Sequence, residues 1–150
     1  MSLDEVPTTK PSGARVLIVD DDADNRELLA LILGWEGFSV TTAECGNDAL
    51  ACIARQLPDV LLLDVMMPGM NGYEVVAVVK AEASSRNVPV MLISALDDRE
   101  TRARAAKAGG DDFLAKPFKR EELIARVRCL LRSKPGLDVT ALDGAGIEPV

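Results

Sequence analysis

Two kinds of apolar pattern alternate along the chain. Short unbroken runs, such as Val60 to Leu63, are typical of strands buried on both faces of a parallel sheet. The segments between them repeat apolar residues at helical spacing. The strands predicted in this way cover residues 15–19, 38–43, 60–64, 88–93 and 113–115. Five strands alternating with five helices predict an α/β fold: a doubly wound five-stranded parallel sheet, (βα)5, with the flavodoxin-like order 2-1-3-4-5.

The spacing of apolar residues also predicts which side of each helix faces the sheet. In the first helix Leu28, Leu31, Ile32 and Trp35 form one stripe. The other stripes are Leu50, Ile53, Ala54 and Leu57 in the second helix, Val75, Val76 and Val79 in the third, and Leu123, Val127, Leu130 and Leu131 in the fifth.

The fourth helix differs from the others because it has only alanines to bury. Alanine removes much less apolar surface from water than leucine, so we expect this helix to be the most weakly anchored. Asp97, followed three residues later by Glu100, resembles a capping box at its start.

Length and composition limit the function. With 150 residues, the chain has room for one domain, expected at 14–133, after a flexible lead-in at 1–13 and before a loose tail or linker at 134–150. A net charge of −7 argues against a nucleic-acid surface. No signal peptide and no apolar run near 18 residues is found, so we expect no membrane contact and a cytoplasmic location. The chain contains no histidine, which excludes imidazole bases and ligands.

The three cysteines, Cys45, Cys52 and Cys129, are odd in number and lack the spacing of metal ligands. We interpret them as small buried apolar residues in a reducing compartment.

Carboxylates stand at the ends of two predicted strands. Asp20, Asp21 and Asp22 follow the first strand, and Asp64 ends the third. In the expected strand order these two strands are neighbours, so the acids would share one crevice. Oxygen ligands alone suit Mg²⁺ or Ca²⁺, and a cluster this small, with room for waters, favours Mg²⁺. A solvated acidic turn would explain Asp20 to Asp22 equally well if they stood alone.

The ends of the last two strands add a hydroxyl at Ser94 and an ammonium at Lys116. With Mg²⁺, these groups could neutralise and bind a phosphoryl group, and Asp64 could be its nucleophile. Considered alone, Ser94 would be interpreted as a turn residue and Lys116 as a solvated cation.

Four motifs together resemble the receiver domain of bacterial two-component response regulators. They are VLIVDDD at 16–22, LLDVMMPGMNG at 62–72, ISA at 93–95 and GGDDFLAKPF at 109–118. The resemblance covers about residues 14 to 133.

The resemblance implies a role for each site residue. Asp64 would be the phosphoacceptor of a phosphorelay, supplied by a sensor histidine kinase, a phosphotransfer protein or a small donor such as acetyl phosphate. The Mg²⁺ cofactor would be bound by Asp21, Asp64 and the Met66 backbone carbonyl, with Asp20 acting mainly through water. The phosphoryl oxygens would be held by Ser94, the Ala95 backbone and Lys116, and the bond from Lys116 to Pro117 would be cis.

The resemblance also implies a switch rather than an enzyme. Ser94 and Phe113 would couple phosphorylation to the face formed by helix four, strand five and helix five, which would contact an output domain, a partner or a second copy of the chain. A plain core role for Phe113 stays open. Met66 and Leu96 would tune loss of the phosphoryl group, and because both are apolar we expect this loss to be slow.

Two other functions compete with this one. A haloacid-dehalogenase-like phosphohydrolase also uses a strand-end Asp, but such enzymes have a second Asp two residues later, where this chain has Met66. A pseudo-receiver would keep the fold and lack the chemistry, which the intact acids, Ser94 and Lys116 argue against.

Overall fold

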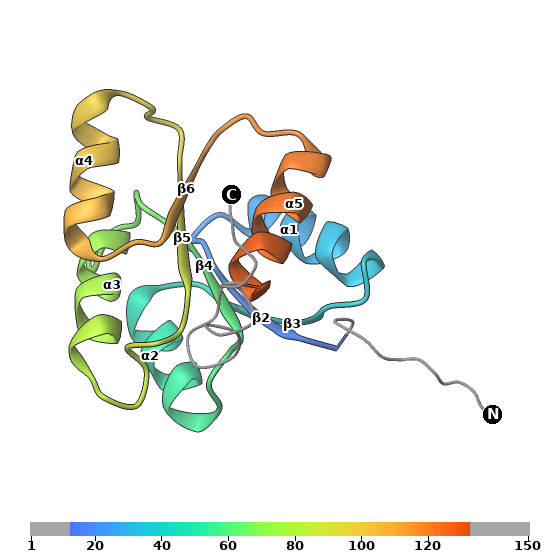
Figure 1. Cartoon of the computed structure of the whole chain (residues 1–150), viewed down its shortest axis with the longest axis horizontal. Helices are drawn as coiled ribbons and strands as arrows, with labels where there is room; N and C mark the ends of the chain where they lie inside the picture. Colours follow the sequence, from blue (N-terminus) through green and yellow to red (C-terminus); the bar gives the residue numbers. More distant parts are fainter. Residues whose placement is uncertain (1–12, 133–150) are drawn as a thin grey trace, which may run out of the picture.

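The computed structural model describes residues 13–132 and shows a five-stranded parallel sheet between two layers of helices (Figure 1). The strand order is β3-β2-β4-β5-β6, which is 2-1-3-4-5 when the strands are counted along the chain, so the fold prediction is confirmed. The predicted lead-in up to residue 12 and the tail at 134–150 lie outside the described residues. The strands are β2 (Arg15–Val19), β3 (Ser39–Ala43), β4 (Val60–Asp64), β5 (Val90–Ser94) and β6 (Asp112–Ala115).

Alternate residues of the central strands point into two separate cores. Leu61 and Leu63 of β4 share one core with residues of α2 (Gly46–Arg55), α3 (Gly72–Ala81) and α4 (Arg99–Ala108). Leu62 lies in the other core, with residues of α1 (Ala23–Trp35) and α5 (Arg120–Arg132). All five residues of β4 and of β5 are buried, as expected for strands covered on both faces.

The predicted inner face of α1 is wrong. Leu29 and Leu33 are the buried residues of this helix, while Leu28, Leu31 and Trp35 are 51%, 53% and 75% exposed. Apolar residues occupy every position from Leu28 to Leu33, so spacing alone allows more than one stripe to face inward. The narrow i, i+4 pair fits against the sheet, and the wider stripe is left on the surface.

The stripe predicted for α2 is only partly right. Ile53 is buried and Leu50 is partly buried, but Ala54 is exposed because Ala49 and Ile53 form the buried face. Leu57 is 45% exposed because the helix ends at Arg55. In α3 and α5 the predicted residues Val75, Val76, Val79, Leu123, Val127 and Leu130 are all buried, and Leu131 is partly buried.

The interpretation of the cysteines as buried residues is also wrong. Cys45 and Cys52 are only partly buried, and Cys129 is exposed. Cys52 lies on the flank of α2 because Ala49 and Ile53 face the sheet, and Cys129 stands between the inward positions Val127 and Leu130 of α5.

Helix α4 buries only Thr101 and Ala105, in keeping with its alanine-rich sequence. Its N-cap is Asp98, which accepts a hydrogen bond from the Thr101 amide, so the helix starts one residue later than a cap at Asp97 would place it. Across residues 13–132, the structure has no helix of the length and apolar character needed to span a membrane.

Candidate phosphoryl-transfer site

Three carboxylates meet at the carboxyl ends of β2 and β4. Asp64 is the last residue of β4, and Asp20 and Asp21 directly follow β2, which pairs with β4. One oxygen from each carboxylate lies within 4.8 Å of the others. Asp20 and Asp64 are buried, whereas Asp21 is exposed, so the cluster opens to solvent on one side.

Asp20 is fixed by hydrogen bonds to the start of α1. Its Oδ1 accepts from the Asp22 amide at 2.9 Å, and the Arg26 guanidinium donates to its backbone carbonyl at 2.8 Å. Asp22 in turn caps α1 by accepting from the amides of Asp24 and Asn25. The run of three acids therefore divides into two acids that face the crevice and one that begins a helix.

The start of α3 packs against the end of β4 and so positions Asp64. A Cβ atom on Gly72 would lie 2.5 Å from the Asp64 backbone oxygen and 2.9 Å from the Val65 Cα. The Gly72 amide also donates to the Val65 carbonyl at 3.0 Å. Because Gly72 has no side chain, α3 can begin directly against the strand end that carries the carboxylate.

Lys116 brings a positive charge to the cluster from the end of β6. Its Nζ lies 3.3 Å from Asp64 Oδ1 and 3.8 Å from Asp20 Oδ2. The Lys116–Pro117 peptide bond is cis, which is the geometry that the family resemblance implies.

Burial raises the pKa of Asp64 from 3.8 to about 6, and the negative charge of Asp20 adds to this increase. The charge and hydrogen bond of Lys116 act in the opposite direction. The Asp64 carboxylate is therefore partly destabilised in the fold, a condition that a bound cation would relieve.

Ser94 and Ala95 lie at the end of β5, beside β4 and β6. Ser94 is fully buried, and its Oγ accepts a hydrogen bond from the Leu96 amide at 3.0 Å. Ala95 is exposed and shares with Lys116 the wall of a hollow of about 400 Å³. The rest of that wall comes from Asn25, Leu28, Leu29, Pro117 and Phe118.

The side chains of Met66 and Leu96 are 60% and 51% exposed, at the ends of β4 and β5 respectively. Phe113 of β6 is buried on the opposite face of the sheet from Leu62, in the core shared with α3 and α4. The structure thus gathers the acids and Lys116 directly, with Ser94 and Ala95 on the neighbouring strand end and Phe113 on the adjacent strand β6.

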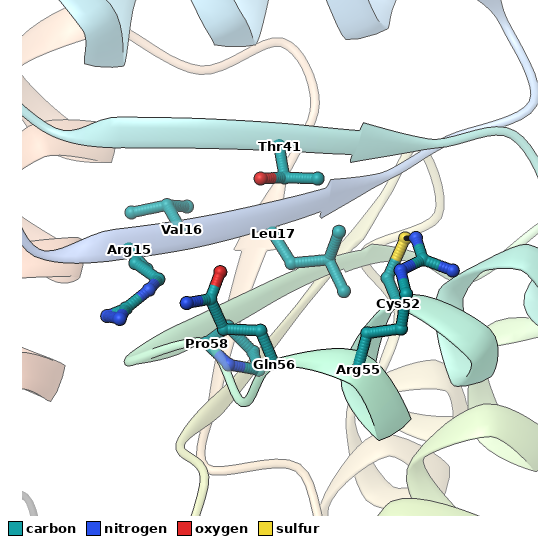
Figure 2. A pocket seen from close by; sticks show the side chains of 8 residues that line it. All are labelled: Arg15, Val16, Leu17, Thr41, Cys52, Arg55, Gln56 and Pro58. Carbon is teal, nitrogen blue, oxygen red and sulfur yellow. Dashed lines mark hydrogen bonds between the residues drawn. The ribbon is translucent and has the colours of Figure 1, made fainter.

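A second hollow, of about 300 Å³, lies away from these residues (Figure 2). It is bounded by the start of β2, by Thr41 of β3 and by the end of α2, with Arg15 and Arg55 among its lining residues. None of the acids, Ser94 or Lys116 lines it, so it is not part of the candidate site.

Three features of the site were missed by sequence reasoning. These are the Arg26 bond to the Asp20 carbonyl, the contact of Gly72 with Asp64, and the Arg102 guanidinium over the Phe113 ring. Of these three, only the close contact of Gly72 could have been anticipated from the sequence, because Gly72 is one of the turn residues that follow the apolar run of β4.

The donor set fits a hard divalent cation. All three side chains offer carboxylate oxygens, without nitrogen or sulfur, and Asp21 leaves the cluster accessible to water. A single ammonium opposes three carboxylates, so the cluster has an excess of negative charge that Mg²⁺ would neutralise.

Comparisons with known proteins identify relatives of this chain. The family model described as "Response regulator receiver domain" matches residues 16–128. The chain is 48% identical over 126 residues to the response regulator PleD of Caulobacter vibrioides, which is 84% of this chain and 28% of that protein. It is 39% identical over 134 residues to the DNA-binding response regulator MtrA of Mycobacterium tuberculosis, which is 89% of this chain and 58% of that protein. The chain therefore spans less than two thirds of the length of each of these relatives.

Solved structures show the same fold. A response regulator from Chloroflexus aurantiacus matches with a TM-score of 0.78 at 37% identity, covering 80% of this chain and 98% of that one. The chemotaxis protein CheY4 of Vibrio cholerae matches with a TM-score of 0.76 at 30% identity, covering 79% and 98%.

Proposed function

Since this chain belongs to the response regulator receiver domain family, we propose that it is a phosphoacceptor switch of a two-component phosphorelay, with Asp64 as the acceptor. The observation that carries the proposal is the meeting of Asp20, Asp21, Asp64 and Lys116 at one edge of the sheet. Receiver domains are signalling switches and not classical enzymes. We expect at most slow self-phosphorylation and dephosphorylation.

In the proposed reaction an Asp64 carboxylate oxygen attacks the donor phosphorus. The new P–O bond gives an aspartyl phosphate, while the bond to the donor breaks and its electron pair leaves with the donor group. Lys116 Nζ, already near Asp64 Oδ1, would pair with a phosphoryl oxygen. Ser94 Oγ and the Ala95 backbone amide would donate to the remaining oxygens.

The proposed cofactor is Mg²⁺, bound by Asp21, Asp64 and the backbone carbonyl of Met66, with Asp20 acting mainly through water. The ion would neutralise the charge that develops on the phosphoryl oxygens. Burial of Asp20 and Asp64 excludes water from one side of that charge, and Asp21 keeps the other side open for the incoming donor.

The proposed donors are a sensor histidine kinase or a phosphotransfer protein. The proposed output surface is formed by α4, β6 and α5, where it would meet an output domain, another protein or a second copy of this chain. Charged groups line this surface: Arg126 of α5 pairs with Asp112 at 2.7 Å and with Glu122 at 3.3 Å. Such pairs can exchange partners between two copies of the chain without leaving buried charge.

The function is tested by incubating the protein with Mg²⁺ and acetyl phosphate and measuring the intact mass. We expect one phosphoryl adduct on the wild type and none on Asp64→Asn. Continuous phosphate release with turnover would instead indicate a phosphohydrolase. Absence of an adduct with acetyl phosphate and with a phosphorylated kinase would indicate a pseudo-receiver.

Millimolar Mg²⁺ is expected to raise the melting temperature, because the ion binds the folded acid cluster and not the dispersed acids of the unfolded chain. At a concentration 100 times its Kd the gain would be about 2.7 kcal/mol. Differential scanning calorimetry with and without Mg²⁺ measures it. Asp21→Asn should reduce the shift, and an unchanged wild-type melting temperature would contradict the metal assignment.

The phosphorylated form is expected to decay slowly. Met66 and Leu96 have exposed apolar side chains, and by the family resemblance they would lie near the phosphoryl group, where an attacking water would find no polar partner. Decay of the adduct, followed by intact mass after removal of the donor, gives the lifetime. Met66→Asn should shorten it, and a wild-type lifetime of seconds would refute the expectation.

A further inference from the structure

The ring of Phe113 is covered by an arginine from α4. The Arg102 guanidinium carbon lies 4.6 Å from the ring centroid, in the geometry of a cation–π contact. Phe113 as a whole is only 7% exposed, although α4 has little apolar surface with which to cover its ring. Arg102 thus takes the place that a large apolar side chain would have on an ordinary helix.

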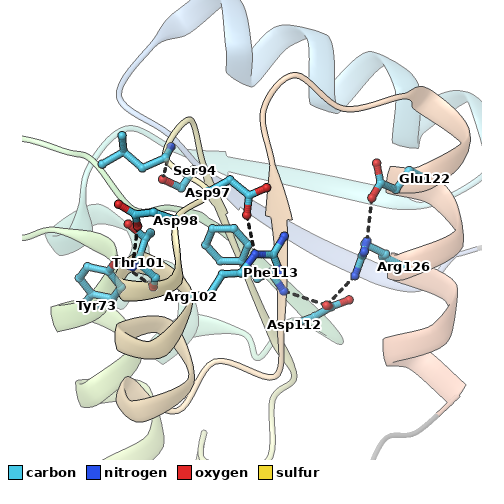
Figure 3. A network of polar contacts seen from close by, with 11 residues as sticks. Tyr73, Ser94, Asp97, Asp98, Thr101, Arg102, Asp112, Phe113, Glu122 and Arg126 are labelled. Atoms are coloured by element: carbon cyan, nitrogen blue, oxygen red, sulfur yellow. Dashed lines mark hydrogen bonds and ion pairs between the residues drawn. The ribbon is translucent and has the colours of Figure 1, made fainter.

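Arg102 is itself held by the loop that follows β5. Its Nε donates to the Asp97 carboxylate, and the two side chains form an ion pair (Figure 3). Each is about half exposed, so the pair can open without leaving a buried charge. Arg102 therefore joins two groups, the Phe113 ring beneath it and the Asp97 carboxylate beside it.

The same loop carries the hydrogen bond of Ser94. Leu96, the residue before Asp97, donates its amide to Ser94 Oγ at 3.0 Å. If Ser94 turns toward a phosphoryl group on Asp64, it must give up this bond, and the backbone next to Asp97 is released. Ser94, the loop, Arg102 and the Phe113 ring are thus joined by consecutive contacts.

The backbone of Phe113 is fixed independently of this loop. Its amide donates to Asp112 Oδ1 at 2.8 Å, and the same oxygen accepts from Arg126 of α5 at 2.7 Å (Figure 3). Because the backbone is held from the α5 side, the ring is the part of Phe113 that can respond when its cover moves.

Helix α4 has a second contact of the same kind. The Arg104 guanidinium carbon lies 4.4 Å from the Tyr73 ring centroid, and the Tyr73 hydroxyl donates to the Thr101 carbonyl. This contact fixes α4 to α3 and does not involve Phe113 or the β5 loop. It therefore provides a comparison within the same helix, equal in chemistry and different in position.

We infer that Arg102, held by Asp97, is a positioning residue that keeps the Phe113 ring in its unphosphorylated orientation and so sets how readily phosphorylation switches the domain. The inference rests on the proposed phosphoacceptor function. A partly exposed cation–π contact shifts an equilibrium constant by roughly two- to fivefold. Loss of the contact should shift the population toward the phosphorylated conformation by that factor.

The test measures binding of beryllofluoride, a phosphoryl analogue, in the presence of Mg²⁺. Arg102→Ala should lower the half-saturating concentration about two- to fivefold. Asp97→Asn should act in the same direction. The matched controls are Arg99→Ala, an exposed arginine of α4 without an ion pair among the described residues, and Arg104→Ala, which removes the contact with Tyr73. Both controls should leave the half-saturating concentration unchanged.

A double-mutant cycle separates positioning from a general loosening of α4. In a Phe113→Leu background, Arg102→Ala should have no further effect on beryllofluoride binding. The same shift in both backgrounds, or an Arg102→Ala protein indistinguishable from Arg99→Ala, would overturn the inference.

NMR of the unphosphorylated protein tests the role of Arg102 without requiring that Asp64 accept a phosphoryl group. Ring resonances of Phe113, assigned with labelled phenylalanine, should shift in Arg102→Ala and stay in place in Arg99→Ala. A wild type that does not respond to beryllofluoride would contradict the phosphoacceptor function, and the ring resonances would still test the positioning role. Unshifted resonances in Arg102→Ala would overturn that role whatever beryllofluoride does.

Discussion

Asp64→Asn is expected to stabilise the fold at neutral pH, although it removes the proposed acceptor. The folded-state pKa of Asp64 is about 6, against 3.8 for an ordinary Asp, mainly because the carboxyl is buried. Between pH 4 and 6 the folded state therefore binds more protons than the unfolded state, and the free energy of unfolding falls as the pH rises. Above pH 6 Asp64 is charged in both states, and the loss of unfolding free energy caused by burying its charge is complete. At 1.36 kcal/mol for each pKa unit this loss is about 3 kcal/mol.

Asparagine carries no charge at any of these pH values, so the variant avoids this cost. The difference in unfolding free energy, variant minus wild type, should be near zero below pH 4 and rise to as much as about 3 kcal/mol above pH 6. Urea unfolding at pH 4, 5, 6 and 7.5, with divalent cations removed by a chelator, measures it.

Glu27→Gln is the matched control, since it neutralises an exposed carboxylate on α1 and changes the net charge equally. Its difference from the wild type should stay small across the same range. A difference for Asp64→Asn that does not vary with pH would show that the Asp64 carboxylate is not destabilised in the fold.

The strand order could be predicted because each strand is recognisable from its own run of apolar residues. An unbroken apolar run needs cover on both faces, and such strands form parallel sheets whose connections follow few rules. The acid cluster followed from the same step, since Asp20 and Asp64 stand at the ends of strands that such a sheet makes neighbours.

The face of α1 could not be predicted because its sequence does not decide between competing stripes. Leu29 and Leu33 face the sheet, whereas Leu28 and Leu31 do not, and the choice depends on how the helix packs as a whole. The cover of Phe113 by Arg102 was missed for a related reason. Their contact joins α4 to β6, and an arginine in a helix with little apolar surface gives no sequence sign that it lies over a ring.

Gly72→Ala is expected to destabilise the fold, although the residue opens a helix in which alanine is ordinarily preferred. Helix propensity alone would favour alanine by roughly 0.5–1 kcal/mol. The added Cβ would lie 2.5 Å from the Asp64 backbone oxygen and 2.9 Å from the Val65 Cα, and these are backbone atoms that cannot rotate away. Such overpacking costs about 1–3 kcal/mol, so the clash should outweigh the propensity.

Gly34→Ala is the control for that balance, because a Cβ on Gly34 of α1 meets nothing within 4 Å. This variant should be stabilised by roughly 0.5–1 kcal/mol through propensity alone. Urea unfolding of both variants gives opposite signs if the contact is tight. The acetyl phosphate reaction then adds a functional measure, since any shift of α3 away from the strand end moves the Asp64 backbone. Gly72→Ala should therefore be phosphorylated more slowly than the wild type, and Gly34→Ala at the same rate. Equal gains in stability for the two variants would show that the start of α3 is not in tight contact with the Asp64 backbone.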